Sequence, residues 1–206
     1  NIGLINELTI FFSKLKINVF DVLDAASTKW NFINMKPGLV GGHCIGVDPY
    51  YLSYKFNKIG VKPTLISAAR KINDNMAKFF AKQILIERKI NKLKGKMLIL
   101  GYTFKENIPD YRNTKIEDLY LALRSKNTFI FDPYYMSFND KILQKYNFTK
   151  KPKKNYYDTV ILAVKHKEFS SKKNNFIKSL LKKKAIVFDI HNFIKGKDNN
   201  FVKEIL

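Results

Sequence analysis

The sequence predicts an α/β chain, with a helical first part followed by a part in which strands and helices alternate. Before Lys92, apolar residues recur at steps of three and four, which is the period of amphipathic helices. After Gly95, short apolar runs alternate with segments of helical period, which is typical of a parallel sheet covered by helices. We therefore divide the chain into a helical domain, residues 1–91, and an α/β domain, residues 92–206.

In the first part we expect four helices, at residues 2–15, 19–26, 49–58 and 64–91. Asp48 is the expected N-cap of the third helix, and Pro49 suits its first turn. Between the second and third helices, residues 30–48 have little period and many glycines, so we expect an irregular loop. The fourth helix would be about 40 Å long. That length suits support of a second domain or subunit, although a bent helix within one core is an equal alternative.

In the second part we expect four strands, at residues 97–100, 128–131, 159–164 and 185–190. Each is a short apolar run of the kind found in buried strands. Helices are expected between them, at residues 114–125, 141–146 and 176–181. Thr114 is the candidate N-cap of the first of these helices, with Glu117 completing a capping box.

Composition excludes several classes of protein. Hydrophobic residues make up 46% of the 206 residues, which is enough for a core and excludes wholesale disorder. The single cysteine excludes an internal disulfide and a cysteine-based zinc site, and we expect no metal. We also expect no membrane partner, since no apolar run approaches the roughly 20 residues of a membrane helix and no signal-peptide pattern is visible.

The net charge of +21 makes a basic nucleic-acid-binding module an alternative function. However, the sequence has no RNA-recognition signature, no zinc finger and no clear basic recognition helix. The densest lysine runs, at residues 150–154 and 182–184, are expected at loops or helix ends. We therefore expect lysines spread over solvated faces rather than a nucleic-acid partner.

Cys44 lies in a glycine-rich segment that also contains His43 and Asp48. Glycines allow the backbone to approach a ligand closely. An accessible thiolate in such a segment could attack a carbonyl carbon, and an acid four residues on could position or activate a water. The alternative for a lone cysteine is a small buried hydrophobic residue. For His43 we favour a structural or substrate-contact role over that of a general base.

A second polar cluster, residues 101–114, follows the first expected strand. Open α/β sheets bind ligands at the carboxyl ends of their strands. Lys105 and Arg112 would bring two positive charges there, which suits a phosphate or diphosphate, although a solvated loop is the alternative. The cluster has neither the G-x-G-x-x-G fingerprint of dinucleotide-binding folds nor the G-x-x-x-x-G-K-[ST] motif of a P-loop. The sequence of this cluster therefore supports neither a dinucleotide-cofactor site nor a P-loop.

Residues 37–52 closely resemble the active-site segment of the UDP-glucose/GDP-mannose dehydrogenase family. The segment reads Pro-Gly-Leu-Val-Gly-Gly-His-Cys-Ile-Gly-Val-Asp-Pro-Tyr-Tyr-Leu. It is most similar to the bacterial branch that oxidises UDP-N-acetylhexosamines for surface polysaccharides. The resemblance continues through residues 6–8, 29–32, 70–76, 100–107 and 110–114, and weakens after about residue 133.

The resemblance implies an architecture. The family has an NAD-binding Rossmann domain, a central helical region with a long dimer-forming helix, and a C-terminal, Rossmann-like nucleotide-sugar-binding domain. This chain resembles the last two, so we expect a parallel α/β sheet after a helical dimerisation region, and a homodimer through residues 64–91. We also expect a C-terminal fragment whose cofactor domain would precede Asn1, and which would be inactive alone.

The resemblance also implies a chemistry, the NAD-dependent oxidation of a UDP-sugar to its uronate in two steps. Cys44 would form a thiohemiacetal and then a thioester, and Asp48 would help to activate the hydrolytic water. The UDP-sugar would be held by residues of two segments, Gly38, Leu39, Val40, Gly41 and Gly42 in the first, Phe104 and Lys105 in the second. Arg112 would face the cofactor. Thiolate chemistry fits a reducing cytoplasm.

Two departures from the family pattern leave open the substrate contact after the last strand and whether the chain belongs to an active enzyme. Many members have an Arg-containing turn after the last strand that contacts substrate, whereas residues 189–192 here read Asp-Ile-His-Asn, so we assign no substrate contact there. The NAD domain is not visible in the sequence, so a catalytically inactive dimerisation remnant is a further alternative.

Overall fold

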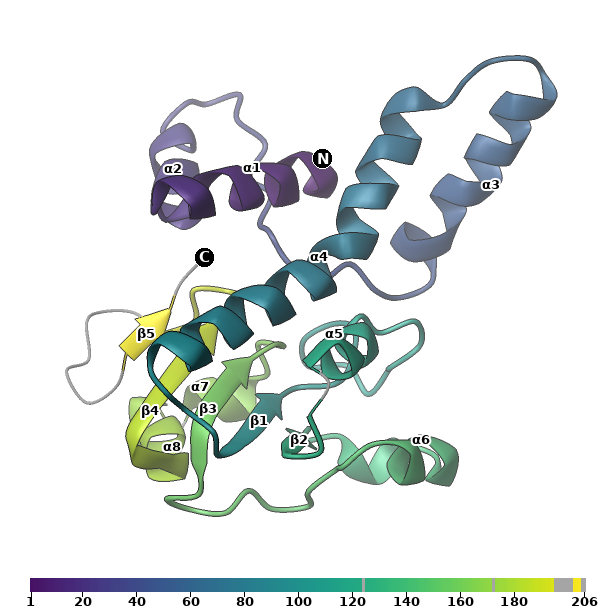
Figure 1. Cartoon of the computed structure of the whole chain (residues 1–206). Coiled ribbons are helices and arrows are strands. Elements are labelled where there is room, and N and C mark those ends of the chain that lie inside the picture. Colours follow the sequence, from purple (N-terminus) through teal and green to yellow (C-terminus); the bar gives the residue numbers. More distant parts are fainter. Residues whose placement is uncertain (124, 172, 195–201, 205–206) are drawn as a thin grey trace.

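The computed structural model describes residues 1–123, 125–171, 173–194 and 202–204 of the chain. The helical part contains four helices: α1 (Ile2–Leu15), α2 (Val19–Ala26), α3 (Cys44–Lys58) and α4 (Thr64–Ile90). Figure 1 shows α3 and the first half of α4 as an antiparallel pair that projects from the rest of the molecule. The second half of α4 lies over the sheet.

The α/β part contains a parallel sheet in the order β2-β1-β3-β4-β5. Its elements in chain order are β1 (Lys96–Leu100), α5 (Ile116–Leu123), β2 (Thr128–Phe131), the 3-10 turn η1 (Tyr135–Ser137), α6 (Asp140–Lys145), β3 (Tyr157–Leu162), α7 (Lys167–Ser171), α8 (Lys173–Leu180), β4 (Leu181–Asp189) and β5 (Val202–Glu204). This architecture confirms the predicted fold class, a helical region followed by a parallel α/β sheet.

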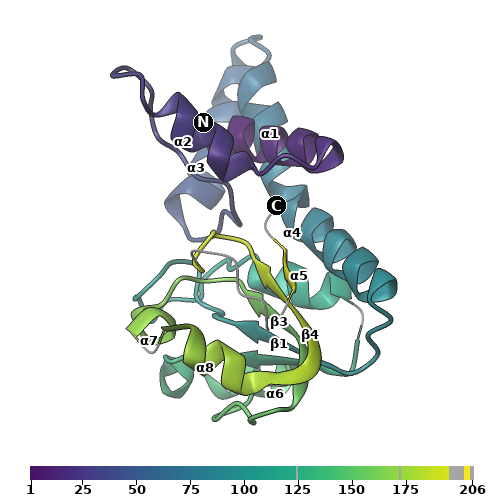
Figure 2. The same cartoon turned by 90° about the vertical axis from the view of Figure 1, so that its left-hand side faces the viewer.

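Alternate strand residues face two separate hydrophobic layers, as the two-residue period of a strand requires. Met97 and Ile99 of β1 pack with α4 and α5, whereas Leu98 and Leu100 pack with α7 and α8. Figure 2 shows these two helix pairs on opposite faces of the sheet. The carboxyl ends of the strands are left uncovered by helices and carry the site described below.

Helix α4 belongs to both parts of the chain. Its second half contributes Phe80 and Ile84 to the sheet core. Arg88, near its end, forms a buried ion pair with Asp158 of β3 and donates to the Gly95 carbonyl oxygen at 3.0 Å. The domain boundary predicted after residue 91 lies at the end of α4. Because α4 packs against both parts of the chain, this position does not test the boundary, which stays a prediction.

The start of α3 differs from the prediction. The helix begins at Cys44, so Asp48 is not its N-cap and Pro49 lies inside it. A proline at this position cannot donate to the carbonyl oxygen of Ile45, four residues before it. The guanidinium of Arg70 in α4 donates to that oxygen instead, at 3.2 Å. This long-range hydrogen bond is why the helix can continue through the proline.

The capping box predicted for α5 is also wrong. Thr114 does accept a hydrogen bond from the Ile116 amide, at 3.2 Å. The Glu117 carboxylate, however, accepts hydrogen bonds from Tyr146 and Lys145. The expected helix 114–125 is shorter than predicted, ending at residue 123, and residue 124 lies outside the described residues.

The remaining expected helices and strands are present with ends shifted by a few residues, and the predictions for α1, α2 and β2 match their bounds. Among the described residues, the prediction missed three short elements, η1, α7 and β5. The lysine runs lie in the loop before β3 and in the first half of β4. None of the helices that the structure describes has the length and apolar character needed to span a bilayer.

Candidate functional site

Two loops far apart in the sequence meet at the carboxyl edge of the sheet. A Cβ atom on Gly41 would lie 2.8 Å from the carbonyl oxygen of Asn113. A Cβ atom on Gly42, whose φ is +82°, would lie 2.7 Å from the ring of Phe104. Side chains at residues 41 and 42 would therefore separate the loops, and glycine is required for their contact.

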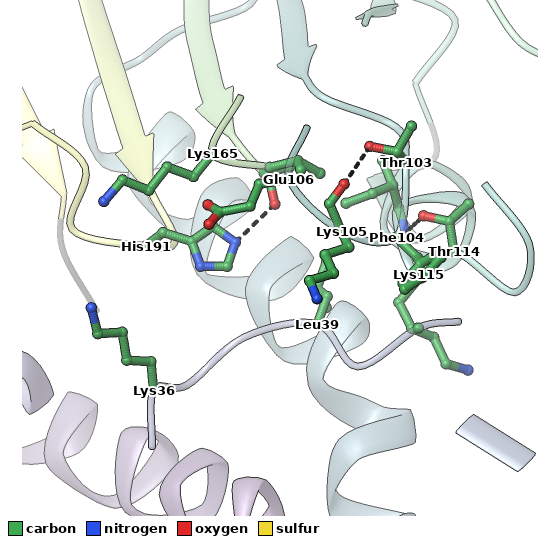
Figure 3. Close-up of a pocket in the computed structure, with 14 residues that line it drawn as sticks. Lys36, Leu39, Thr103, Phe104, Lys105, Glu106, Thr114, Lys115, Lys165 and His191 are labelled. Atoms are coloured by element: carbon green, nitrogen blue, oxygen red, sulfur yellow. Dashed lines mark hydrogen bonds between the residues drawn. The ribbon is translucent and has the colours of Figure 1, made fainter. Parts of the chain in front are cut away.

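An open cavity of about 320 Å³ lies between these loops and the ends of β1, β3 and β4. Leu39, Gly41, Phe104 and Lys105 are among the residues that line it, so four of the residues predicted to hold substrate lie together. Figure 3 shows the ammonium group of Lys105 pointing into this cavity.

The cavity is rich in positive charge. Lys36, Lys105, Lys115 and Lys165 line it, with Glu106 as the one acidic residue among the described lining residues. Lys115 is neutralised by Asp74 and Asp118, at 3.3 and 3.1 Å. In the part of the chain that the structure describes, Lys36, Lys105 and Lys165 form no ion pair. Three unpaired ammonium groups at one cavity suit an anionic ligand.

His191 lines the same cavity, at the turn for which the sequence left a substrate contact undecided. Its Nε2 lies 3.0 Å from the carbonyl oxygen of Ala163. Because a carbonyl oxygen only accepts, Nε2 carries the proton and Nδ1 is a hydrogen-bond acceptor when the ring is neutral. Burial lowers the pKa of His191, which keeps the ring neutral at pH 7. His191 therefore adds a neutral ring to a cationic cavity.

A second cavity, of about 460 Å³, adjoins the first and shares Thr114 and Lys115 with it. It is lined by Val40, because neighbouring residues of the extended loop point to opposite sides. Asp74 of α4 is the centre of its charge network, accepting from Tyr50 and Arg70, both at 2.6 Å. Burial favours the neutral acid, but the Tyr50 hydroxyl and the cations of Arg70 and Lys115 hold the pKa of Asp74 below its usual value.

A third cavity, of about 720 Å³, contains Cys44 and Asp48 and shares Arg70 with the second. Cys44 is exposed and is the first residue of α3. Asp48 lies one turn later on the same face of the helix. The three cavities therefore form a series from Lys105 to Cys44 in which each shares lining residues with the next.

Arg112 lies on the Cys44 side of this series. Its guanidinium pairs with Asp110 at 2.6 Å, while its side chain remains 71% exposed. Hydrogen bonding to Asp110 raises the pKa of Arg112, and the charge on Cys44 raises it further by a smaller amount. The same ion pair lowers the pKa of Asp110. Arg112 thus places an accessible positive charge near the thiol.

One residue important for the site was missed by the sequence analysis. Asn6 of α1 is fully buried and donates to the Gly38 carbonyl oxygen at 3.0 Å and to Asn73 of α4 at 2.8 Å. It also accepts from the Gly38 amide at 2.9 Å. Gly38 itself is therefore fixed by Asn6 rather than lining the first cavity. An asparagine on the apolar face of an amphipathic helix is the signal that could have identified it.

Replacing Asn6 with leucine is expected to destabilise the protein by about 2–4 kcal/mol, because both polar groups of Gly38 lose their partner. Urea denaturation of the purified chain measures the change. Glu7→Gln, at the exposed neighbouring position, is the control and should have little effect. A loss below about 1 kcal/mol for Asn6→Leu would show that water replaces the amide.

Across the described residues, no three His, Cys, Asp or Glu side chains gather in an arrangement able to hold a metal ion.

Family models match two segments of the chain. Residues 1–75 match the central domain, and residues 98–196 the UDP-binding domain, of the UDP-glucose/GDP-mannose dehydrogenase family. The chain belongs to this family. The predicted resemblance to the family is thereby confirmed.

Curated relatives within the family are similar over nearly the whole chain. A UDP-N-acetyl-D-glucosamine 6-dehydrogenase of Salmonella typhi is 43% identical over 97% of this chain and 48% of its own length. A protein of the same name from Pseudomonas aeruginosa is 42% identical over 92% of this chain and 46% of its own length. The chain spans about half the length of the curated relatives it matches.

Solved structures of the family have the same fold. An NDP-N-acetyl-D-galactosaminuronic acid dehydrogenase of Methanosarcina mazei superimposes with a TM-score of 0.80 at 26% identity, over 98% of this chain and 46% of its own. The UDP-N-acetyl-mannosamine dehydrogenase Cap5O of Staphylococcus aureus gives a TM-score of 0.73 at 28% identity, over 98% of this chain and 46% of its own.

Proposed function

We propose that this chain is the substrate-binding half of an NAD-dependent dehydrogenase that oxidises a UDP-N-acetylhexosamine, such as UDP-N-acetylglucosamine, to its uronate. The observation that carries the proposal is the series of neighbouring cavities, each sharing lining residues with the next, from the cationic pocket at Lys105 to the cavity that contains Cys44. A nucleotide sugar has matching parts, an anionic diphosphate in the nucleotide and a neutral sugar attached to that diphosphate. The 42–43% identity to UDP-N-acetyl-D-glucosamine 6-dehydrogenases supports the choice of sugar.

At the nucleotide end, Lys105 and Lys36 are among the charges available to the diphosphate. The backbone from Leu39 to Gly41 borders the first two cavities, and in the proposed binding mode its amides donate to phosphate and sugar oxygens. The ring of Phe104 packs against Gly42 and holds this backbone beside the Lys105 loop.

At the sugar end, Cys44 is the proposed nucleophile. When bound, NAD accepts one hydride in each of the two oxidations. After the C6 hydroxyl has been oxidised to an aldehyde, the Cys44 thiolate adds to the carbonyl carbon to form a thiohemiacetal. The second oxidation converts it to a thioester. Water then attacks the thioester carbonyl, and the C–S bond breaks to release the uronate and regenerate the thiolate.

Asp48 lies one turn from Cys44 in the same cavity. In the proposed mechanism its carboxylate accepts a proton from the hydrolytic water as that water attacks the thioester. Helix α3 fixes the spacing of the two side chains, so the acid is positioned for the thioester and not for the nucleotide end.

Arg112 fits a role toward NAD, because its cation is exposed and lies close enough to Cys44 to interact with its charge. The described residues include no G-x-G-x-x-G loop to hold the cofactor's diphosphate. We therefore propose that a separate NAD-binding domain completes the enzyme and that this chain does not turn over alone.

Lys105→Ala tests the nucleotide end directly. The substitution is expected to weaken UDP binding by about tenfold, because a charge-assisted contact to phosphate is lost. Binding of uridine, which has no phosphate, should not change. Calorimetric titration of the 206-residue chain measures both. Lys94→Ala, at the opposite edge of the sheet, is the matched control, and equal losses in both variants would show that only overall charge matters.

We also propose that two copies associate through α4, residues 64–91, and the neighbouring α3. This projecting pair exposes large apolar side chains, including Tyr51, Leu52, Tyr54 and Leu65, the last of which is 82% exposed. Contiguous apolar surface of this kind favours a protein interface. Leu65→Asp is expected to shift the mass measured by light scattering from dimer to monomer, and a wild-type monomer at micromolar concentration would contradict the proposal.

A further inference from the structure

A buried His–Asp pair lies beneath the loop that carries Lys105. His166 follows β3 and Asp132 follows β2, and both are 0% exposed. The His166 Nε2 and Asp132 Oδ2 atoms are 3.2 Å apart. Neither side chain reaches the cavities, and neither takes part in the chemistry proposed above. Burying two ionisable groups is costly, so their arrangement calls for a physical explanation.

The hydrogen bonds of His166 define its tautomer. The backbone amide of Asn107 donates to Nδ1 at 3.0 Å, so Nδ1 carries no proton. The ring proton is therefore on Nε2, where the carboxylate of Asp132 and the hydroxyl of Thr103, at 3.1 Å, both accept from it. Edge contacts with the rings of Tyr134 and Phe169 prevent the imidazole from turning to another orientation.

This arrangement holds the Lys105 loop at every second residue. The Thr103 amide donates to Asp132 at 3.2 Å, and the Thr103 hydroxyl donates to the Lys105 carbonyl oxygen at 3.0 Å. The Asn107 amide is held by His166, and the Asn107 side-chain oxygen accepts from the Lys167 amide at 2.8 Å. Asn107 adopts a left-handed conformation, with φ of 61°, which asparagine tolerates.

The side chain of Lys105 points the other way, into the cavity (Figure 3). Hydrogen bonds therefore fix the backbone of the Lys105 loop on the side that faces His166, while the ammonium group of Lys105 lies on the opposite side, in the cavity. Without these hydrogen bonds the loop would become ordered only when the ligand binds. The lost conformational entropy of the loop would then weaken ligand binding.

We propose that His166 is a positioning residue for nucleotide binding, which through Thr103 and Asn107 fixes the backbone of residues 103–107 so that Lys105 meets the phosphates. This proposal rests on the proposed function, because it assumes that the cavity binds a nucleoside diphosphate. Asp132 contributes in two ways. Its carboxylate accepts directly from the Thr103 amide, and it holds the proton of His166 on Nε2, which keeps Nδ1 available to the Asn107 amide.

Two substitutions separate the hydrogen bond from the bulk of the ring. His166→Leu fills the space and removes both polar atoms. His166→Asn keeps an acceptor at the place of Nδ1. We expect His166→Leu to weaken UDP binding by about tenfold, as Lys105→Ala does, and to leave uridine binding unchanged. His166→Asn is expected to remain within about threefold of the wild type. Calorimetric titration of the 206-residue chain measures each affinity.

A double-mutant cycle with Lys105 gives the deciding result. If His166 acts through Lys105, His166→Leu has little further effect on UDP affinity in the Lys105→Ala background. Full additivity, or an equal loss of uridine affinity, would overturn the proposal. Ile84 is a residue of α4 that packs in the sheet core. Ile84→Ala is therefore the control for loss of stability alone, and it should leave UDP affinity unchanged.

Hydrogen exchange keeps this proposal distinct from the proposed function. In His166→Leu the Asn107 amide should exchange faster than in the wild type, whereas in His166→Asn it should stay protected. If the wild-type chain binds no UDP, the proposed function fails, and the positioning of the loop is then judged from exchange alone. Unchanged protection of Asn107 in His166→Leu would overturn the positioning role whatever the ligand.

Discussion

Cys44→Ala is expected to abolish uronate formation, with a loss of at least about 10⁴-fold in kcat, because no other thiol exists in the chain. The measurement is NADH formation by this chain joined to an NAD-binding domain, with UDP-N-acetylglucosamine as substrate. UDP affinity should not change, since Cys44 and Lys105 line different cavities. Loss of turnover with intact binding is the signature of a nucleophile.

Two variants make this result specific. Cys44→Ser keeps the size of the side chain but replaces the thiolate by a hydroxyl of far weaker nucleophilicity, so it should also be inactive. Lys55→Ala alters an exposed residue about three turns further along the same helix, outside the cavities. It should retain most of the activity. Uronate formation at the wild-type rate by Cys44→Ala would exclude the covalent mechanism.

The helices and strands predicted correctly are those whose apolar pattern lies entirely within their own residues. The apolar stripe of α1 and the apolar run of β2 are complete within their own residues, so their bounds followed from sequence spacing. The start of α3, by contrast, is not determined by neighbouring residues alone. It depends on Arg70, which lies 25 residues from Ile45 and satisfies the carbonyl oxygen that Pro49 leaves free. A reading based on neighbouring residues therefore placed the helix start at the proline.

The same distinction applies to the site. The position of Lys105 at the end of a parallel strand was predictable, because ligands bind at that edge of open sheets. The packing of Phe104 on Gly42 was not, since it joins loops from the two parts of the chain. Asn6 and His166 were also missed, because their partners lie 32 or more residues away in the sequence.

Arg88→Ala is expected to produce the largest loss of stability, about 3–5 kcal/mol. Arg88 and Asp158 are 7% and 4% exposed, so removal of the guanidinium leaves a carboxylate buried without its counter-charge. The Gly95 carbonyl oxygen loses its donor as well. Urea denaturation of the purified chain measures the change. Lys89→Ala, on the exposed face of the same helix turn, is the control and should shift stability by less than about 0.5 kcal/mol.

The double variant Arg88→Met with Asp158→Asn tests whether the cost arises from the unpaired charge. With no charge left to bury, it should recover much of the loss, because a buried ion pair contributes less than the penalty for breaking it. The pair lies at the amino-terminal end of β3, opposite the cavity, so the folded fraction of every variant should bind UDP as the wild type does. A change in UDP affinity would instead mean that the anchoring of α4 to the sheet sets the geometry of the cavity.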